Sequence, residues 1–226
     1  MRIQHNMTAL NANRQLGISN SILAKSTEKL SSGYKINRAG DNAAGLSISE
    51  KMRGQIRGLE QASTNAQDGV SLIQTAEGAL NEIHSVIQRM RELTVQASND
   101  TNVSKDRSAI SDELTALKEE IDRIADQTEF NTMKLLNGSF TSKSLQVGAN
   151  KDQMISFEIT SMNASGLGVQ SIAGVVLSAT NGASITGELS TLDAALESVS
   201  KQRSALGALQ NRLEHTIANA DNVAEN

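Results

Sequence analysis

The sequence predicts a mainly α-helical fold: a long antiparallel helical rod or coiled-coil bundle with one small β-hairpin region. Three observations lead to this prediction. Through most of residues 41–100, apolar residues recur at alternating intervals of three and four, which keeps one apolar seam on a helix face. The 226 residues contain no proline to interrupt a helix, and aromatic side chains make up only 2% of them. Packing must therefore come from aliphatic residues, which suit thin seams between helices.

The longest predicted helix occupies about residues 41–98. Asp41 or Asn42 is expected to cap its start, because a short polar side chain can accept bonds from the first free backbone N–H groups. The polar run at residues 99–102 is expected to end it. With a rise of 1.5 Å per residue, this helix would be roughly 85 Å long. Its seam consists of Ile48, Met52, Leu59, Ala62, Ala66, Ile73, Ala76, Leu80, Ile83, Ile87, Met90 and Ala97.

Shorter heptad patterns predict three further helices, over about residues 6–31, over residues 104–127 and from residue 188 onward. The short connection after the long helix favours an antiparallel return of the 104–127 helix along it. The defining apolar positions are Ala9, Leu16, Leu23 and Leu30 in the first, Ile110, Leu114, Leu117, Ile121 and Ile124 in the second, and Leu192, Val199, Leu206, Leu213 and Ala220 in the last. Residues 1–40 are thus expected to form one segment, and residues 41–226 a rod domain.

The region between the last two helices has a different pattern. Within residues 130–160, Leu145 and Val147 alternate with polar residues, as do Ile155 and Phe157, and a turn-rich stretch separates the two runs. This pattern is typical of a β-hairpin. Residues 160–187 are rich in Ser, Gly, Ala and Asn, and their structure is only weakly specified by the sequence.

The charge distribution is uneven, although the net charge is only −4. Residues 1–60 carry nine basic and four acidic side chains, and the remaining residues carry twelve and twenty-one. The basic segment holds one aromatic residue, Tyr34, and no run of Lys or Arg, so a nucleic-acid partner is not expected. No stretch approaches the roughly 20 apolar residues that span a bilayer, and the N-terminus lacks the apolar core of a cleavable signal peptide.

Catalytic, metal and cofactor sites are not expected. The chain has no cysteine, and its three histidines, His5, His84 and His215, are scattered without a metal-ligand spacing. No nucleophile elbow or phosphate-binding loop is present. Adjacent acids such as Glu119 and Glu120 are better explained as a solvated helix face than as an acid–base pair.

Several long blocks of the sequence resemble the bacterial flagellins. The stretch LSSGYKINRAGDNAAGLSISEKMRGQIRGLEQA at residues 30–62 is similar to the N-terminal signature of that family, and NAQDGVSLIQTAEGALNEI at residues 65–83 continues it. Three further blocks follow in the family's order: QRMRELTVQ at residues 88–96, EFNTMKLLNG at residues 129–138 and LGALQNRLEHTI at residues 206–217. The resemblance covers about residues 1–150 and 188–226.

The resemblance implies a structural subunit that self-assembles with other flagellin subunits into the extracellular flagellar filament for motility. Such subunits pass through the flagellar export machinery without a cleavable signal peptide. Compared with the family, the chain is expected to be a short form in which residues 160–187 are a remnant of the variable outer domain. It is also expected to be truncated at the C-terminus, so that residues 1–40 lack their partner helix. Two alternatives remain: a hook–filament junction protein, and an unrelated exported coiled-coil adhesin or enzyme carrier.

The resemblance also implies recognition by the vertebrate Toll-like receptor for flagellin. The matching positions are Arg89 and Leu93 on the long helix and Glu113 on the next helix, with Leu93 expected to offer exposed apolar area. The alternative for Arg89 and Glu113 is an ordinary surface ion pair. The residues expected to pack helices or subunits together are Leu16, Leu23, Leu30, Ile73, Leu80, Ile83, Ile87, Leu206 and Leu213.

Overall fold

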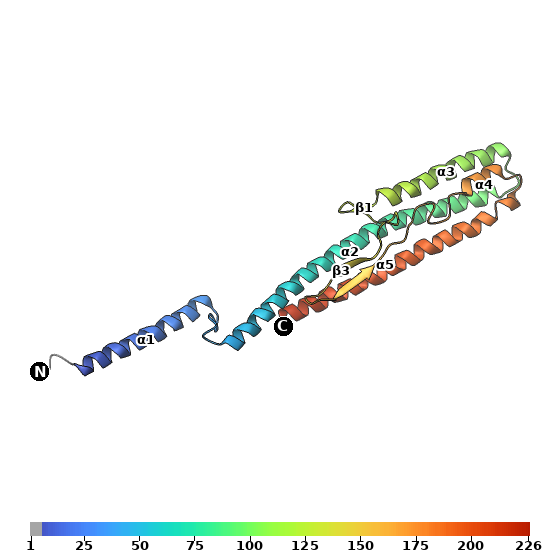
Figure 1. Ribbon diagram of the computed structural model, residues 1–226. Coiled ribbons are helices and arrows are strands. Elements are labelled where there is room, and N and C mark those ends of the chain that lie inside the picture. Colours follow the sequence, from blue (N-terminus) through green and yellow to red (C-terminus); the bar gives the residue numbers. More distant parts are fainter. Residues whose placement is uncertain (1–5) are drawn as a thin grey trace. The chain divides into compact units, whose positions relative to one another are not determined.

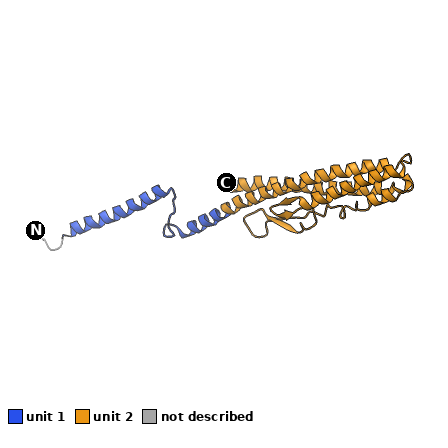
Figure 2. Cartoon of the chain, turned by 90° about the horizontal axis from the view of Figure 1, so that it is seen from above, with its two compact units in different colours: residues 1–55 blue, residues 56–226 orange. Residues whose placement is uncertain are grey.

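The computed structural model describes residues 6–226 and contains two compact units, residues 1–55 and residues 56–226 (Figure 2). Long helices dominate both units, and within residues 6–226 strands occur only as two small antiparallel pairs. The predicted fold class is therefore confirmed.

The first unit contains helix α1 (Met7–Ser32) and the start of helix α2 (Ala43–Ala97). The side chain of Asn6 caps α1 by accepting a hydrogen bond from the Ala9 N–H at 3.2 Å. Gly33 ends the helix in the left-handed conformation, with φ of 72°, and its N–H donates to the Lys29 carbonyl. Asn42 precedes α2, and its Oδ1 accepts from the Gly45 N–H at 2.9 Å, in agreement with the expected cap.

In the second unit, α3 (Ser104–Gln127) and α5 (Gly187–Glu225) run along α2 (Figure 1). Two ion pairs join α2 to α5, Arg91 with Asp193 and Glu77 with Arg203. The α2 residue with the higher number, Arg91, pairs with the α5 residue with the lower number, so the two helices are antiparallel. The bounds of α3 are those that the heptad pattern predicts.

The α2 seam is buried through most of this unit, as the alternating spacing predicts. Leu80, Ile83 and Ile87 have no exposed surface, whereas Ile48 and Met52, which belong to the first unit, are each 59% exposed. The buried residues of α2 in the second unit are Ala62, Ser63, Ala66, Gly69, Leu72, Ile73, Ala76, Leu80, Ile83, Ile87, Met90, Leu93, Thr94 and Ala97.

Residues 128–159 form two hairpins. Strands β1 (Glu129–Phe130) and β2 (Met133–Lys134) are joined by Asn131 and Thr132, which both have positive φ, of 48° and 64°. Two successive residues with positive φ make the tight turn whose twist suits a hairpin. The predicted hairpin is formed by β3 (Lys143–Gln146) and β4 (Met154–Phe157), in which Leu145 pairs with Ile155.

Two glycines of α2 allow the second hairpin to lie close against that helix. A Cβ atom added at Gly69 would come within 2.4 Å of Leu145 Cδ1, and one added at Gly58 within 2.9 Å of Ala149 Cβ. The two glycines are eleven residues apart, which is close to three helical turns, so they share a face. The Asn65 side chain fixes the hairpin further by donating to the Gln146 carbonyl at 3.1 Å.

Residues 160–187 are more ordered than their composition suggested. They include the short helix α4 (Ile172–Ser178) and the 3-10 turn η1 (Gly182–Ser184). The segment packs on α3, where the Ser111 hydroxyl donates to the Ala173 carbonyl and the Asp122 carboxylate accepts from the Ala164 N–H. Its buried apolar residues are Met162, Ala164, Leu167, Val169, Ile172, Val176 and Ile185.

A buried arginine holds the end of the bundle together at the α2–α3 connection. Arg107 is 6% exposed and donates to the Ala97 carbonyl at 3.3 Å, to the Thr180 carbonyl at 3.4 Å and to Asp100 Oδ1 at 3.2 Å. The same Asp100 oxygen accepts from the Gly182 N–H at 2.6 Å. Three acceptors thus meet around one guanidinium, and one of them, Asp100, also binds the backbone of Gly182.

Two glycine substitutions test this packing. A Cβ atom at Gly182 would lie 1.8 Å from the Ser98 carbonyl oxygen, so Gly182→Ala should lower the free energy of unfolding by about 2 kcal/mol or more. Gly78 lies in α2 with nothing within 4 Å of the added atom, so Gly78→Ala should raise it by about 0.5–1 kcal/mol. Chemical denaturation measures both, and equal effects of the two substitutions would contradict the assigned contact.

Candidate functional site

Helix α1 presents large apolar side chains to solvent along its whole length. None of its residues is buried in the chain. Leu16 is 63% exposed, Leu23 is 64% exposed and Leu30 is 87% exposed, although heptad spacing places them on one face. The other exposed apolar residues of the helix are Met7, Leu10, Ile18 and Ile22. Exposed apolar surface of this extent is typical of a protein–protein contact.

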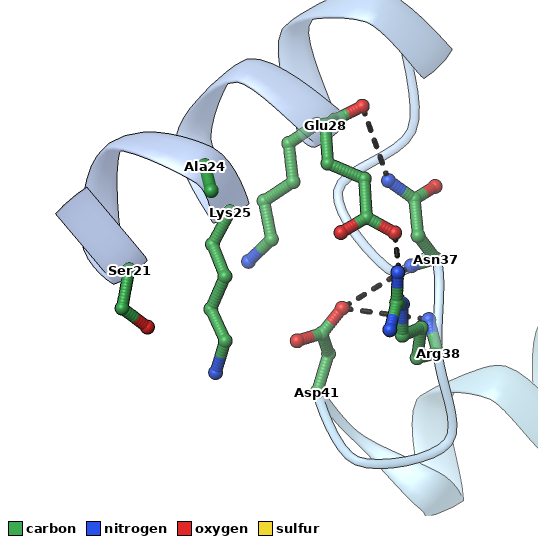
Figure 3. Close-up of a pocket in the computed structure, with 8 residues that line it drawn as sticks. Ser21, Ala24, Lys25, Glu28, Asn37, Arg38 and Asp41 are labelled. Atoms are coloured by element: carbon green, nitrogen blue, oxygen red, sulfur yellow. Dashed lines mark hydrogen bonds and ion pairs between the residues drawn. The ribbon is translucent and has the colours of Figure 1, made fainter.

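The connection from α1 to α2 is held by polar contacts with the end of α1 (Figure 3). Arg38 Nε donates to Glu28 Oε1 at 2.9 Å, and the Asn37 amide donates to the Ser32 hydroxyl at 2.8 Å. The backbone N–H groups of Asn37 and Arg38 both donate to the Asp41 carboxylate at 3.4 Å. Glu28, Asn37, Arg38 and Asp41 line a hollow in the first unit beside Lys25 and Lys29.

The same contacts keep Asp41 ionised. The hydrogen bond from the Asn37 N–H is the main cause that lowers the pKa of this carboxyl, and the bond from Arg38 and the charges of Lys29 and Lys25 act in the same direction. A lowered pKa in the folded chain means that the stabilising contribution is present at neutral pH. It is lost as the pH falls below the ordinary range of an aspartate.

The other predicted packing residues lie inside the second unit. Ile73, Leu80, Ile83, Ile87 and Leu213 have no exposed surface, and Leu206 is 2% exposed. They form one apolar core together with α3, the hairpins and residues 160–187. Their contacts are made within the second unit, whereas the three leucines of α1 are exposed.

The structure brings Arg89 and Glu113 together on the outside of the second unit. Two guanidinium nitrogens of Arg89, Nε and Nη2, donate to Glu113 Oε1 at 3.0 Å and 2.8 Å, and Nη1 donates to Glu92 at 3.1 Å. The Glu113 hydrogen bonds are the main cause that raises the pKa of Arg89. Both side chains remain about half exposed, at 49% and 45%.

Leu93 differs from the expectation that it offers exposed apolar area. It is 2% exposed and belongs to the core cluster. The physical reason is that α2 is covered on more than one side, so its buried surface is wider than a two-column seam. Leu93 lies one turn from Arg89, but its side chain is part of the fold.

Residues 6–226 contain no group of three or more His, Asp or Glu side chains placed to hold a metal ion. His84 lies on α2 and His215 on α5, 131 positions apart in the chain, and His5 lies outside the described residues. Within the same residues, no helix combines the length and apolar character needed to cross a bilayer. The described geometry is that of a protein built from packed helices.

Family comparisons agree with this class. The bacterial flagellin N-terminal helical region matches residues 3–141, and the bacterial flagellin C-terminal helical region matches residues 189–226. The chain is 55% identical to the flagellin of Halalkalibacterium halodurans, covering all of this chain and 82% of that protein. It is 49% identical to the Bacillus subtilis flagellin, with 100% and 84% covered. The chain therefore belongs to the bacterial flagellin family.

Solved structures show the same fold. The Bacillus cereus flagellin crystal structure aligns with a TM-score of 0.59 at 28% identity, covering 70% of this chain and 88% of that one. A putative flagellar hook-associated protein from Vibrio parahaemolyticus aligns with a TM-score of 0.70 at 13% identity, covering 82% and 95%. At that identity the second likeness concerns the fold alone. The sequence relationship places the chain with the flagellins.

Sequence reasoning missed Arg107 and Asp100, which organise the end of the bundle. The sequence pattern marks Asp100 only as part of the polar run at residues 99–102, and it assigns no role to Arg107. One signal was available, because Arg107 lies three residues before Ile110 and four before Ser111, on the buried face of α3. An arginine on the apolar stripe of a helix indicates a buried polar contact.

The different burial of Arg89 and Leu93 gives a stability prediction. Leu93→Ala removes a fully buried side chain and should lower the free energy of unfolding by about 2–5 kcal/mol. Arg89→Ala removes only half-exposed ion pairs and should cost less than about 1 kcal/mol. Thermal and denaturant unfolding of the two single variants measures the difference, and equal losses would show that the assigned burial of Leu93 is wrong.

Proposed function

We propose that this chain is a structural subunit that assembles with further copies of itself into the extracellular bacterial flagellar filament. The family relationship supports this function, and the apolar face of α1 is the observation that carries it. Leu16, Leu23 and Leu30 are largely uncovered among residues 6–226. Since apolar surface is buried when a partner is available, the natural cover for a repeated subunit is another copy of the same protein.

Charge supports contact between copies. Residues 1–55 carry eight basic and three acidic side chains, a net charge of +5, while residues 56–226 carry thirteen and twenty-two, a net charge of −9. The two values sum to the chain's −4. Opposite charges on the two units favour arrangements in which the first unit of one copy lies near the second unit of another, and they disfavour like-with-like contacts.

Export fits the same proposal. A filament subunit reaches the outside through the flagellar export machinery, so this machinery is a second proposed partner. The chain contains no cysteine, so its fold makes no use of disulfides and needs no oxidising compartment to form them. The bacterial flagellins are structural proteins, and the proposed function requires no catalysis, metal or cofactor.

Substitutions on α1 test the assembly function. Leu16→Glu with Leu23→Glu places two charges on the apolar face and should abolish filaments or shorten them severely, since each buried charge without a partner is costly. The unfolding of residues 56–226 should be unchanged, because neither leucine belongs to the core of that unit. Electron microscopy of filaments on cells that carry the variant gives the readout, together with its amount in the medium.

Asn13→Glu with Ser31→Glu is the matched control. It adds the same charge to α1 in a sector that carries no large apolar side chain, about 60° from Leu16 at 100° per residue, and filaments should form. Filaments of normal length from the leucine variant would refute the assignment. Loss of filaments in both variants would show that α1 tolerates no added charge on any face. The apolar face would then no longer explain the loss of assembly.

We also propose recognition by the vertebrate Toll-like receptor for flagellin, centred on Arg89 and Glu113. The observation that favours this proposal is the half-exposed Arg89 guanidinium. Glu113 and Glu92 orient it by hydrogen bonds, so its N–H donors are already ordered before a partner binds. Leu93 contributes to this surface only indirectly, by supporting the helix beneath Arg89.

The receptor proposal has a matched test on the same helix. Arg89→Ala should weaken binding to the purified receptor ectodomain by about tenfold or more, as expected of an interface hot spot. Arg91→Ala also removes an α2 arginine and an ion pair, to Asp193 on α5, and should leave affinity unchanged. Unfolding curves should be nearly identical for both. Equal affinities of the two variants would refute the site.

A further inference from the structure

We propose that Asn137 is a site of spontaneous chemical modification. Its side-chain amide is converted to a carboxylate through a cyclic imide formed with the backbone nitrogen of Gly138. The second Asn-Gly pair of the chain, Asn181-Gly182, is protected from the same reaction by the hydrogen bond between the Gly182 N–H and Asp100. This inference does not depend on the proposed function.

The reaction needs an electrophilic side-chain carbon and a free backbone nitrogen in the next residue. The Gly138 nitrogen loses its proton and forms a bond to Asn137 Cγ, which pushes negative charge onto Oδ1. The Cγ–Nδ2 bond then breaks, and Nδ2 leaves as ammonia after taking a proton from water. Water next opens the imide at either carbonyl, giving aspartate or isoaspartate. The balance is one water consumed and one ammonia released, with no oxidation or reduction.

The surroundings of Asn137 favour the first step. Oδ1 accepts two hydrogen bonds, from the Ser139 N–H at 3.0 Å and from the Ser139 hydroxyl at 2.7 Å. These donors draw electron density from Cγ and stabilise the oxyanion that forms on attack. Among the hydrogen bonds of residues 6–226, Asn137 Nδ2 donates none, so the leaving group is not held.

The attacking atom is also free. Gly138 has no side chain to hinder its nitrogen, and this N–H donates no hydrogen bond among the described residues. The chain on either side is fixed, because the Met162 N–H donates to the Leu136 carbonyl and the Ile159 N–H to the Phe140 carbonyl. Asn137, Gly138 and Ser139 form the short link between these two anchored points.

Asn181-Gly182 has the same sequence and the opposite environment. The Gly182 nitrogen donates to Asp100 Oδ1 at 2.6 Å, and Asp100 is itself held by Arg107 at 3.2 Å. Gly182 is buried. The Asn181 side chain is occupied in capping η1, where Oδ1 accepts from the Ser184 N–H at 3.1 Å. Attack therefore requires the carboxylate hydrogen bond to break first, which lowers the rate by about tenfold or more.

Modification at Asn137 would alter a packed region. It adds one negative charge beside buried Leu135, Leu136 and Phe140. The isoaspartate product also lengthens the main chain by one carbon between the two anchored points. We therefore expect aged protein to be less stable than fresh protein in proportion to its modified fraction.

The experiment is incubation of the purified full chain at mildly alkaline pH, followed by tryptic digestion and mass spectrometry. Cleavage after Lys134 and Lys143 separates the Asn137 peptide from the one that contains Asn181. In the folded protein, Asn137 should convert at least about tenfold faster than Asn181. In denaturant, the two sites should convert at similar rates. Equal rates in the folded protein, or no conversion at Asn137 while denatured chain reacts, would overturn the proposal.

Two pairs of variants test whether the hydrogen bonds to Asp100 and Ser139, rather than local unfolding, set the conversion rates of Asn181 and Asn137. Asp100→Ala removes the acceptor for Gly182 and should open Asn181 to conversion, whereas Asp100→Asn keeps an oxygen acceptor there and should leave it protected. Both variants lose the charge that pairs with Arg107, so they are matched in that respect. Ser139→Ala removes one donor to Asn137 and should slow that site by about two- to tenfold, with Ser142→Ala as the control. Unchanged rates in Asp100→Ala and Ser139→Ala would contradict the assigned roles.

Discussion

Burial of the α2 seam is the interaction on which the other elements of residues 56–226 depend. Leu80, Ile83 and Ile87 are fully covered, and each buried aliphatic side chain of this size contributes about 1.5–3 kcal/mol. The helices α3 and α5, the β3–β4 hairpin and residues 160–187 all contact this one apolar cluster. Because aromatic residues are scarce, many small contacts replace the few large ones of a compact core. Alanine and glycine positions, such as Ala66 and Gly69, let the neighbours approach closely enough for these contacts to form.

The same heptad chemistry gives a different result in residues 1–55. Leu16 in α1 and Leu80 in α2 both belong to apolar columns with heptad spacing. The Leu16 side chain is nevertheless 63% exposed, whereas Leu80 has no exposed surface. A lone helix gains little stability from propensity, so α1 has less to hold it than α2 has. Its apolar face therefore has a use only when another surface covers it. This contrast between a buried seam and an exposed one supports the proposal that α1 is the surface used for assembly.

Much of the fold could be predicted from the sequence, because heptad spacing and polar caps report local geometry directly. The Asn42 cap, the bounds of α3 and the β3–β4 pairing follow from such signals. The burial of Leu93 could not be predicted, because a seam of two apolar columns does not show how many elements pack around a helix. The structure of residues 160–187 could not be predicted for another reason. Ser, Gly, Ala and Asn surround each apolar residue there, so no periodic pattern forms, and only tertiary contacts with α3 select the conformation of the segment. The two Asn-Gly pairs are alike in sequence, and only the position of Asp100 separates them.

Hydrogen exchange followed by mass spectrometry tests the central claim most directly, because amide protection reports local opening. In the free subunit, amides of α1 should exchange fast, while those of α2 between Ala62 and Ala97 should exchange at rates set by unfolding of the bundle. In assembled filaments, α1 should become protected and the α2 amides should change little. Protection of α1 in the free subunit equal to that of α2, or no gain of protection on assembly, would contradict the account.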